Sequence, residues 1–197
     1  MKLLEDRIRR DGKVAPGNVL RVDSFINHQM DILFMEKLAE EIRRRFTDKP
    51  VDKILTIEAS GIAIATLVAQ KFGVPLVSAK KSKSSNLPDN IYTCSVKSYT
   101  HGNVNSVLVT QDYLKAGENV LIIDDFLAHG EALKGLINLV EQAGGTVVGA
   151  GIVVEKAYQR GADALRASGL QVESLARVAS MDAETGTVEF KIGRAHV

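Results

Sequence analysis

The chain has 197 residues, 45% of them hydrophobic and 25% charged, and its formal net charge at pH 7 is +1. This is the composition of a globular protein, and the length suffices for one well-buried domain, which we predict over residues 1–191. The near-neutral charge argues against a dedicated nucleic-acid binder, because such proteins usually carry a clear basic excess.

A single cysteine, Cys94, excludes an internal disulfide and fits a cytoplasmic protein. No apolar run approaches the ~20 residues that a membrane span needs, so we expect no membrane partner. Residues 1–12 lack the apolar core of a signal peptide. The last six residues, I-G-R-A-H-V, match the translation of a common sequencing adapter, so we expect residues 192–197 to be a non-native tail.

The first predicted elements are a short helix, a strand and a long amphipathic helix. Residues 2–11 place Leu4 and Ile8 on one helical face. Residues 20–25 alternate apolar and polar side chains, which predicts a strand. From Asp31 onward, apolar residues recur at helical spacing and predict a helix with one buried face. These residues are Ile32, Met35, Leu38, Ile42 and Phe46.

Strands and helices then alternate, which indicates an α/β fold: a parallel sheet flanked by helices on both faces. The next predicted elements are strands at residues 54–57, 74–79, 120–123 and 147–155, helices at residues 61–72 and 131–143, and C-terminal elements at residues 163–168, 172–178 and 187–191. The third of these strands is apolar throughout, as expected of a strand that is covered on both faces.

Residues 92–111 interrupt the alternation with two strand-like segments, Y-T-C-S-V-K-S-Y and V-N-S-V-L-V-T, joined by T-H-G-N. They predict a long antiparallel hairpin inserted between two parallel strands. Cys94 lies in the first segment, where we expect a small, half-buried residue and not a nucleophile.

The segment V-L-I-I-D-D-F-L-A-H-G-E-A, residues 120–132, carries the clearest chemical signal. Ligands bind beyond the carboxyl ends of parallel strands, where we expect Asp124 and Asp125 to lie. The small residues that follow let backbone N–H groups approach an anion, and the helix N-terminus adds partial positive charge. Carboxylates beside such a phosphate cradle predict a ligand with both a phosphate and a diol or metal. Receiver domains also use an Asp-Asp strand end, but near the start of the chain.

Two further segments predict a second anion site. In T-I-E-A-S-G-I, residues 56–62, a turn of Ala59, Ser60 and Gly61 joins a strand to a helix and can present backbone N–H groups. The alternative is an ordinary turn with Ser60 as the N-cap. Lysines in A-K-K-S-K follow the next strand, and Lys81 is the candidate for an anion contact. The alternative there is a set of solvated surface lysines.

These segments resemble the type I phosphoribosyltransferases, whose signature is four apolar residues, two acidic residues and a small-residue loop that opens a helix. The resemblance implies their fold, with an inserted hairpin and a small hood from the N- and C-terminal segments. It also implies that Asp124 and Asp125 contact the ribose hydroxyls or stabilise positive charge on the sugar ring. Phosphoribosyl pyrophosphate would be held by Ala128, His129, Gly130, Glu131 and Ala132 at its 5-phosphate, and by Ala59, Ser60, Gly61 and Lys81 at its diphosphate.

Two residues of the loop depart from the family pattern. Many members have Thr where His129 stands, and Gly or Thr where Glu131 stands. Backbone donors tolerate both changes, but the Glu131 side chain has to turn away from a bound phosphate. The resemblance also implies Mg²⁺ held mainly by substrate oxygens and water, with no dedicated protein metal site, and a homodimer.

The base pocket depends on residues outside the shared signature. Bacterial family members that act on xanthine share the segments L-R-V-D-S-F-I-N-H-Q-M-D, G-I-V-V-E-K and V-E-S-L-A-R. This resemblance implies purine salvage, with Leu20, Asn27 and Lys156 in the base pocket. Because an ammonium only donates hydrogen bonds, Lys156 favours an oxopurine over adenine. Asn27 suits either a 2-oxo or a 2-amino group, which leaves xanthine and guanine open, and Phe126 either stacks on the base or packs under the loop.

Two alternative functions also fit a chain with these segments. A regulator with the same fold could sense phosphoribosyl pyrophosphate, but the known purine-operon repressors of this kind carry an added DNA-binding domain. The single short N-terminal helix and the near-neutral charge do not suggest one. An enzyme that acts on adenine is the other alternative, and Lys156 counts against it.

Overall fold

The computed structural model describes residues 1–81, 90–97 and 104–191. Its main sheet has six strands in the order β10-β9-β8-β7-β3-β4. Every neighbouring pair is parallel except β9 and β10, which are antiparallel. The strands are β3 (Lys53–Ile57), β4 (Leu76–Ala79), β7 (Asn119–Leu127), β8 (Thr146–Lys156), β9 (Val172–Met181) and β10 (Val188–Phe190). The predicted parallel sheet is therefore confirmed.

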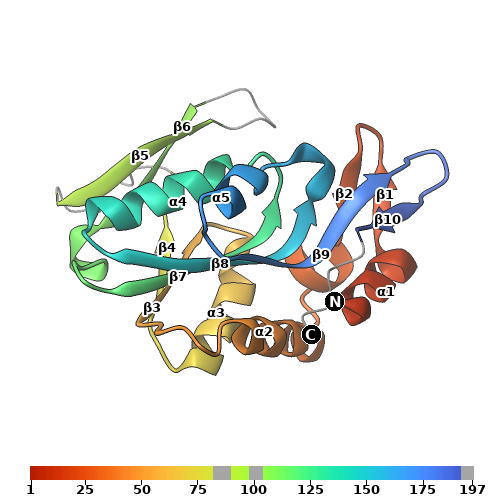
Figure 1. Cartoon of the computed structure of the whole chain (residues 1–197). Helices are drawn as coiled ribbons and strands as arrows, with labels where there is room; N and C mark the ends of the chain where they lie inside the picture. The colour runs from red at the N-terminus through yellow and green to blue at the C-terminus, as the bar shows by residue number, and fades with distance from the viewer. Residues whose placement is uncertain (82–89, 98–103, 192–197) are drawn as a thin grey trace.

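Helices cover both faces of this sheet, as Figure 1 shows. On one face lie α2 (Ile32–Arg45) and α3 (Gly61–Phe72), and on the other lie α4 (Glu131–Gln142) and the short α5 (Asp163–Ala167). Successive side chains of β7 point to the two faces of the sheet in turn, because side chains alternate along a strand. Leu121 and Ile123 pack with α2 and α3, whereas Val120 and Ile122 pack with α4.

Local sequence signals explain where these helices begin and end. The Asp31 carboxylate accepts a hydrogen bond from the Phe34 backbone N–H at 3.1 Å and caps α2. α3 ends at Gly73, which has a positive φ of 69° that favours glycine. None of the helices in the described part of the chain is long and apolar enough to cross a membrane.

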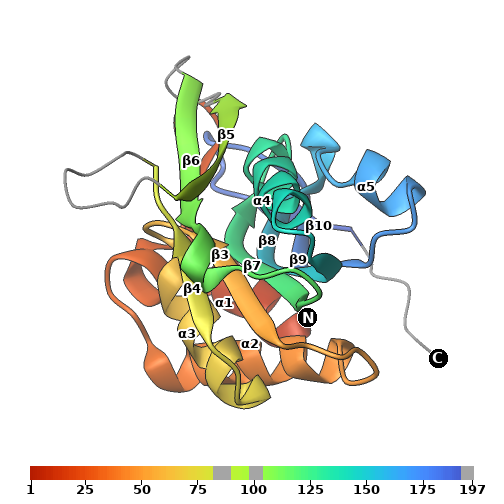
Figure 2. The ribbon, with the colours of Figure 1, turned by 90° about the vertical axis from the view of Figure 1, so that its left-hand side faces the viewer.

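The predicted hairpin is present as β5 (Ile91–Lys97) and β6 (Val104–Thr110), which pair antiparallel. Its connecting residues 100–103 lie outside the described residues. The hairpin stands beside α4 (Figure 2), where the Cys94 thiol donates a hydrogen bond to the Gly135 carbonyl at 3.3 Å. Backbone hydrogen bonds of 2.9 Å in both directions between Lys80 and Leu108 attach it to the end of β4.

The N- and C-terminal segments gather at one end of the sheet, which agrees with the predicted hood (Figure 1). This end holds α1 (Lys2–Asp11), the antiparallel pair β1 (Lys13–Ala15) and β2 (Val19–Arg21), and β10. The residues expected to form a non-native tail, 192–197, lie outside the described part.

The predicted strand at residues 20–25 is wrong beyond Arg21. The chain instead forms a five-residue π-helix, Asp23–Asn27. The adjacent residues Phe25 and Ile26 are both fully buried. A strand would direct one of these neighbours away from the core, and a helical turn buries both.

The remaining short segments connect the main elements. Two single 3-10 turns, Gln111–Tyr113 and Ala157–Gln159, follow β6 and β8. The second of them leads to Arg160, which has a positive φ of 58°, and to Gly161. This connection between β8 and α5 packs against the loop that precedes α4.

Candidate active site

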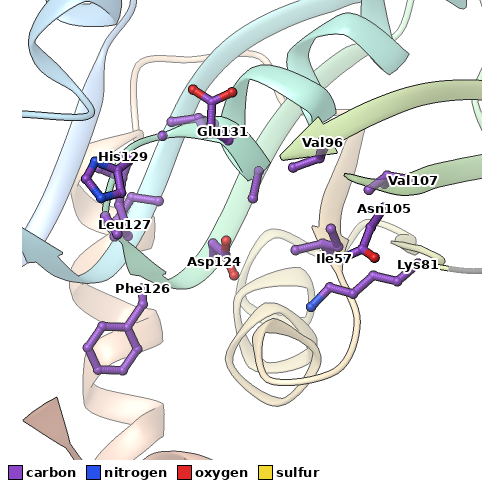
Figure 3. A pocket seen from close by; sticks show the side chains of 15 residues that line it. Ile57, Lys81, Val96, Asn105, Val107, Asp124, Phe126, Leu127, His129 and Glu131 are labelled. Atoms are coloured by element: carbon purple, nitrogen blue, oxygen red, sulfur yellow. The ribbon is translucent and has the colours of Figure 1, made fainter. Parts of the chain in front are cut away.

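A cavity of about 220 Å³ lies beyond the carboxyl ends of the parallel strands, where ligands bind in such sheets. It is lined by residues from the end of β7, the loop before α4, the end of β3 and the β5–β6 hairpin (Figure 3). Its walls include Ile57, Lys81, Val96, Asn105, Val107, Asp124, Phe126, Leu127, Ala128, His129, Gly130, Glu131, Ala132, Leu133 and Ile152.

The loop from Ala128 to Ala132 turns β7 into α4 at the edge of this cavity. Gly130, at the helix N-cap, has a positive φ of 84°. The first N–H groups of a helix have no acceptor within the helix, so this end of α4 offers donors to an anion. The Glu131 carboxylate accepts a hydrogen bond from Lys134 at 3.0 Å and points away from Asp124 in Figure 3, which leaves the donors accessible.

The two acidic residues are both nearly buried, with exposures of 7% for Asp124 and 5% for Asp125. They are held differently. Asp124 Oδ1 accepts the backbone N–H of Asp125 at 3.0 Å, and Asp124 lines the cavity. Asp125 Oδ1 accepts the Ser60 hydroxyl at 3.0 Å, and Asp125 is not among the residues of the cavity wall.

Burial and the negative charge of Asp125 raise the pKa of Asp124 well above its usual range. The positive charge of Lys81 acts in the opposite direction. In Figure 3 the Lys81 side chain extends across the cavity toward Asp124. A carboxyl group in this position is sensitive to any further charge that enters the cavity.

The turn at Ala59, Ser60 and Gly61 lies directly behind the acidic pair. A Cβ on Gly61 would lie 3.0 Å from Asp124 Oδ1 and 2.3 Å from the Thr56 hydroxyl oxygen, so only glycine fits there without displacing its neighbours. The Ser60 side chain does not cap α3, although Ser60 occupies the N-cap position. The hydroxyl reaches Asp125 instead, so the alternative of a simple N-cap does not describe this serine.

The peptide between Glu58 and Ala59 is cis. The Glu58 carboxylate accepts the backbone N–H of Lys81 at 2.7 Å and forms an ion pair with Lys80 at 3.1 Å. The turn after β3 and the end of β4 are therefore held together, and Lys81 is fixed at the cavity wall through its backbone.

The residues predicted for the base lie on three separate elements. Leu20 is buried on β2, Asn27 ends the π-helix, and Lys156 ends β8. Within the described residues, the Asn27 side-chain oxygen is buried without a hydrogen-bond partner. Burial lowers the pKa of Lys156. Phe126 lines the cavity and also packs against the core under α2, so its contacts fit both predicted roles.

The cavity thus brings together only part of the predicted site. The predicted residues on its wall are Lys81, Asp124, Phe126, Ala128, His129, Gly130, Glu131 and Ala132. The predicted residues elsewhere are Asp125, Ala59, Ser60 and Gly61, which lie behind Asp124, and Leu20, Asn27 and Lys156, which the same cavity does not include.

Gly161 and Asn105 are among the residues at the site that sequence reasoning missed. Gly161 packs against the loop, since a Cβ there would lie 2.1 Å from the Ala128 carbonyl oxygen and 2.7 Å from the Gly130 nitrogen. Asn105 reaches the cavity from the hairpin. A polar residue in the otherwise apolar face of a predicted strand was a signal for Asn105, but nothing in the sequence marked Gly161.

A family model described as the phosphoribosyl transferase domain matches residues 24–178. The chain belongs to this phosphoribosyltransferase family. The family predicted from the acidic pair and its loop is therefore confirmed.

Relatives of this phosphoribosyltransferase match it over nearly its whole length. The xanthine phosphoribosyltransferase of Lachnoclostridium phytofermentans is 52% identical over 191 residues, covering 97% of this chain and 98% of the relative. The xanthine phosphoribosyltransferase of Bifidobacterium adolescentis is 54% identical over 192 residues, covering 97% of this chain and 100% of the relative. The solved adenine phosphoribosyltransferase of Rhodothermus marinus has a TM-score of 0.73 and 23% identity, and the match covers 88% of this chain and 97% of that chain. This last likeness confirms the fold alone.

Proposed function

We propose that the chain transfers the 5-phosphoribosyl group of phosphoribosyl pyrophosphate to xanthine, giving xanthosine 5'-monophosphate and pyrophosphate in purine salvage. The relatives at 52% and 54% identity are named xanthine phosphoribosyltransferases and match nearly the whole chain. The observation that carries the proposal is one cavity that joins Lys81, Asp124 and the loop at residues 128–132. These parts match a ligand with a diphosphate, a ribose and a 5-phosphate.

In the proposed reaction, a ring nitrogen of the base forms a bond to the anomeric carbon, and the bond from that carbon to the diphosphate oxygen breaks. Pyrophosphate leaves with the electron pair, and the base loses a proton. The loop would hold the 5-phosphate through backbone N–H groups. Asp124 and Asp125 would stabilise positive charge on the sugar ring, and Lys81 would stabilise negative charge on the leaving group.

Mg²⁺ is the proposed cofactor. Within residues 1–81, 90–97 and 104–191, no group of three or more His, Cys, Asp and Glu side chains could hold a metal ion. The diphosphate and water would supply most of its ligands, and Asp124, which lines the cavity, offers a hard oxygen atom of the kind that Mg²⁺ prefers. When bound there, the ion would offset negative charge on the diphosphate.

The proposed base contacts are Leu20, Asn27 and Lys156. The Lys156 ammonium would donate to the 6-oxo group, which xanthine, guanine and hypoxanthine have and adenine lacks. The unpartnered Asn27 oxygen supports a ligand contact, because an unpaired buried polar atom costs about 1–3 kcal/mol. The names of the relatives favour xanthine among the oxopurines.

A cytoplasmic homodimer is also proposed. Met30, Ile32 and Leu33 are 45%, 50% and 73% exposed around the start of α2, which is apolar surface that a second copy could cover. Light scattering coupled to size-exclusion chromatography tests this assembly. A monomeric mass at micromolar concentration would contradict it.

One assay tests the activity. The protein is incubated with Mg²⁺, phosphoribosyl pyrophosphate and one base at a time, and pyrophosphate release is measured for xanthine, guanine, hypoxanthine and adenine. Xanthine should give the highest kcat/KM. A preference for adenine would contradict the proposed base pocket, and no turnover with any of the four would contradict the enzymatic function altogether.

A further inference from the structure

One face of the β5–β6 hairpin lies against α4 and the cavity. Alternation along the strands and the cross-strand pairs Cys94↔Val107 and Val96↔Asn105 place these four side chains on the same face. The apolar members of the face pack in the core under α4. They are Tyr92, Cys94, Val96, Val107 and Val109. Asn105 is the polar exception on this face, and it lines the cavity.

The position of this face is closely determined. A Cβ on Gly135 of α4 would lie 2.5 Å from Val96 Cγ2 and 3.2 Å from the Cys94 sulfur, so the hairpin packs directly on the helix backbone. The Lys80 and Leu108 backbones hydrogen-bond in both directions and fix the other strand beside Lys81. Asn105 is therefore held at a defined place relative to both Lys81 and α4.

The Asn105 side chain is half-buried, and no hydrogen bond to its amide is found within the described part of the chain. Figure 3 shows it directed from the hairpin toward Ile57 and Lys81. Valine would continue the apolar face and suits a strand better than asparagine does. An amide without a hydrogen-bond partner among the described residues, on an otherwise apolar face, is accounted for by a ligand.

We propose that the Asn105 amide donates a hydrogen bond to the diphosphate of phosphoribosyl pyrophosphate, next to Lys81. This inference rests on the proposed function. The 5-phosphate loop occupies one part of the cavity wall, and Asp124 lies between that loop and Lys81 (Figure 3). Asn105 and Lys81 are thus two donors on the side away from the loop, where the leaving group would lie.

The test compares Asn105→Val and Asn105→Asp with the wild-type protein. The measurements are KM for phosphoribosyl pyrophosphate, KM for xanthine, and, by calorimetry, the dissociation constant of pyrophosphate from the protein in the presence of Mg²⁺. Asn105→Val should raise the KM for phosphoribosyl pyrophosphate and the dissociation constant of pyrophosphate about tenfold, the effect of one lost hydrogen bond to a charged group. Asn105→Asp should raise both further because its charge repels the diphosphate. KM for xanthine should change less than about twofold, within the scatter of context effects.

Ser106→Val is the matched control, because Ser106 is exposed on the opposite face of β6. It should leave all three constants unchanged. Thermal melting separates binding from folding, since Asn105→Val should match or exceed the wild-type Tm if the amide serves only the ligand.

Three outcomes would overturn the inference. One is an unchanged affinity of Asn105→Val for both ligands. The second is an affinity loss that parallels a lower Tm. The third is an Asn105→Asp variant that binds as well as the wild type, because ribose hydroxyls can donate hydrogen bonds to a carboxylate, whereas a diphosphate is repelled by it. A wild-type protein that binds neither phosphoribosyl pyrophosphate nor pyrophosphate would instead contradict the proposed function.

Discussion

Gly161 offers the sharpest test of how the loop at residues 128–132, the proposed 5-phosphate site, is positioned. A Cβ at this residue would lie 2.1 Å from the Ala128 carbonyl oxygen, 2.5 Å from the His129 carbonyl carbon and 2.7 Å from the Gly130 nitrogen. All three are backbone atoms, so no side-chain rotation can relieve the clash. A carbon and a carbonyl oxygen approach to about 3.3 Å at their closest ordinary contact, so Gly161→Ala has to displace the loop by roughly 1 Å.

The displacement should affect substrate binding more than folding. A misplacement of about 1 Å at a substrate-positioning group can reduce the rate about 100-fold. Overpacking of a well-packed site costs roughly 1–3 kcal/mol of stability. We therefore expect Gly161→Ala to lower kcat/KM for phosphoribosyl pyrophosphate about 100-fold while the protein remains folded.

Steady-state kinetics and thermal melting together measure both effects. Gly169→Ala is the control, because Gly169 has a positive φ of 90° but no atom within 4 Å of the place that a Cβ would occupy. That variant should lose some stability through backbone strain and keep the wild-type kinetics. If Gly161→Ala retained the wild-type kcat/KM, the loop would not depend on its contact with Gly161, and the steric reasoning would be wrong.

Three further predictions concern charge and hydrogen bonding. Asp124→Asn should lower turnover yet raise Tm at neutral pH. Because the pKa of Asp124 is raised, wild-type stability falls as pH rises from the ordinary carboxyl range through that pKa, and the variant should lack this slope. Parallel profiles of Tm against pH for the wild type and the variant would refute this prediction. Ser60→Ala should lower kcat at least tenfold, because it removes the hydrogen bond that holds Asp125. A hydrogen bond to a charged group contributes about 1.5–3 kcal/mol. An unchanged kcat would contradict this prediction. Lys156→Met should raise KM for xanthine about 100-fold and leave KM for phosphoribosyl pyrophosphate near the wild-type value. Because burial lowers the pKa of Lys156, the affinity of the wild type for xanthine should also fall as pH rises toward that pKa. A xanthine affinity that does not change at alkaline pH would count against the contact.

The sequence predicted the layers of the fold well, because hydrophobic periodicity reports burial directly. The helix at residues 61–72 has the bounds that the structure gives to α3, from the Ser60 N-cap position to Gly73. The hairpin was also predicted, since β-branched and aromatic residues, which favour strands, are frequent in both of its segments. The strand predicted for residues 120–123 is longer in the structure and runs to Leu127, because Asp124 and the residues after it continue to pair with β8.

The site was predicted less completely, because its geometry depends on contacts between distant segments. The loop residues and Asp124 share one cavity wall, and their roles remain predictions. The contact of Gly161 with Ala128 joins residues that are far apart in the chain, and no local pattern encodes it. Ser60 was considered for its backbone or as an N-cap, whereas the structure uses its hydroxyl to reach Asp125.

The hydrogen bond between Ser60 and Asp125 has a consequence for how the two halves of the substrate bind. It joins the turn after β3 to the acidic end of β7, so ordering one segment also restricts the other. When binding at one place lowers the conformational-entropy cost of binding at a second place, the two binding events become cooperative. By linkage, each ligand then raises the affinity for the other by the same factor. Ribose 5-phosphate and pyrophosphate, as separate molecules, are therefore expected to bind synergistically through this single hydroxyl.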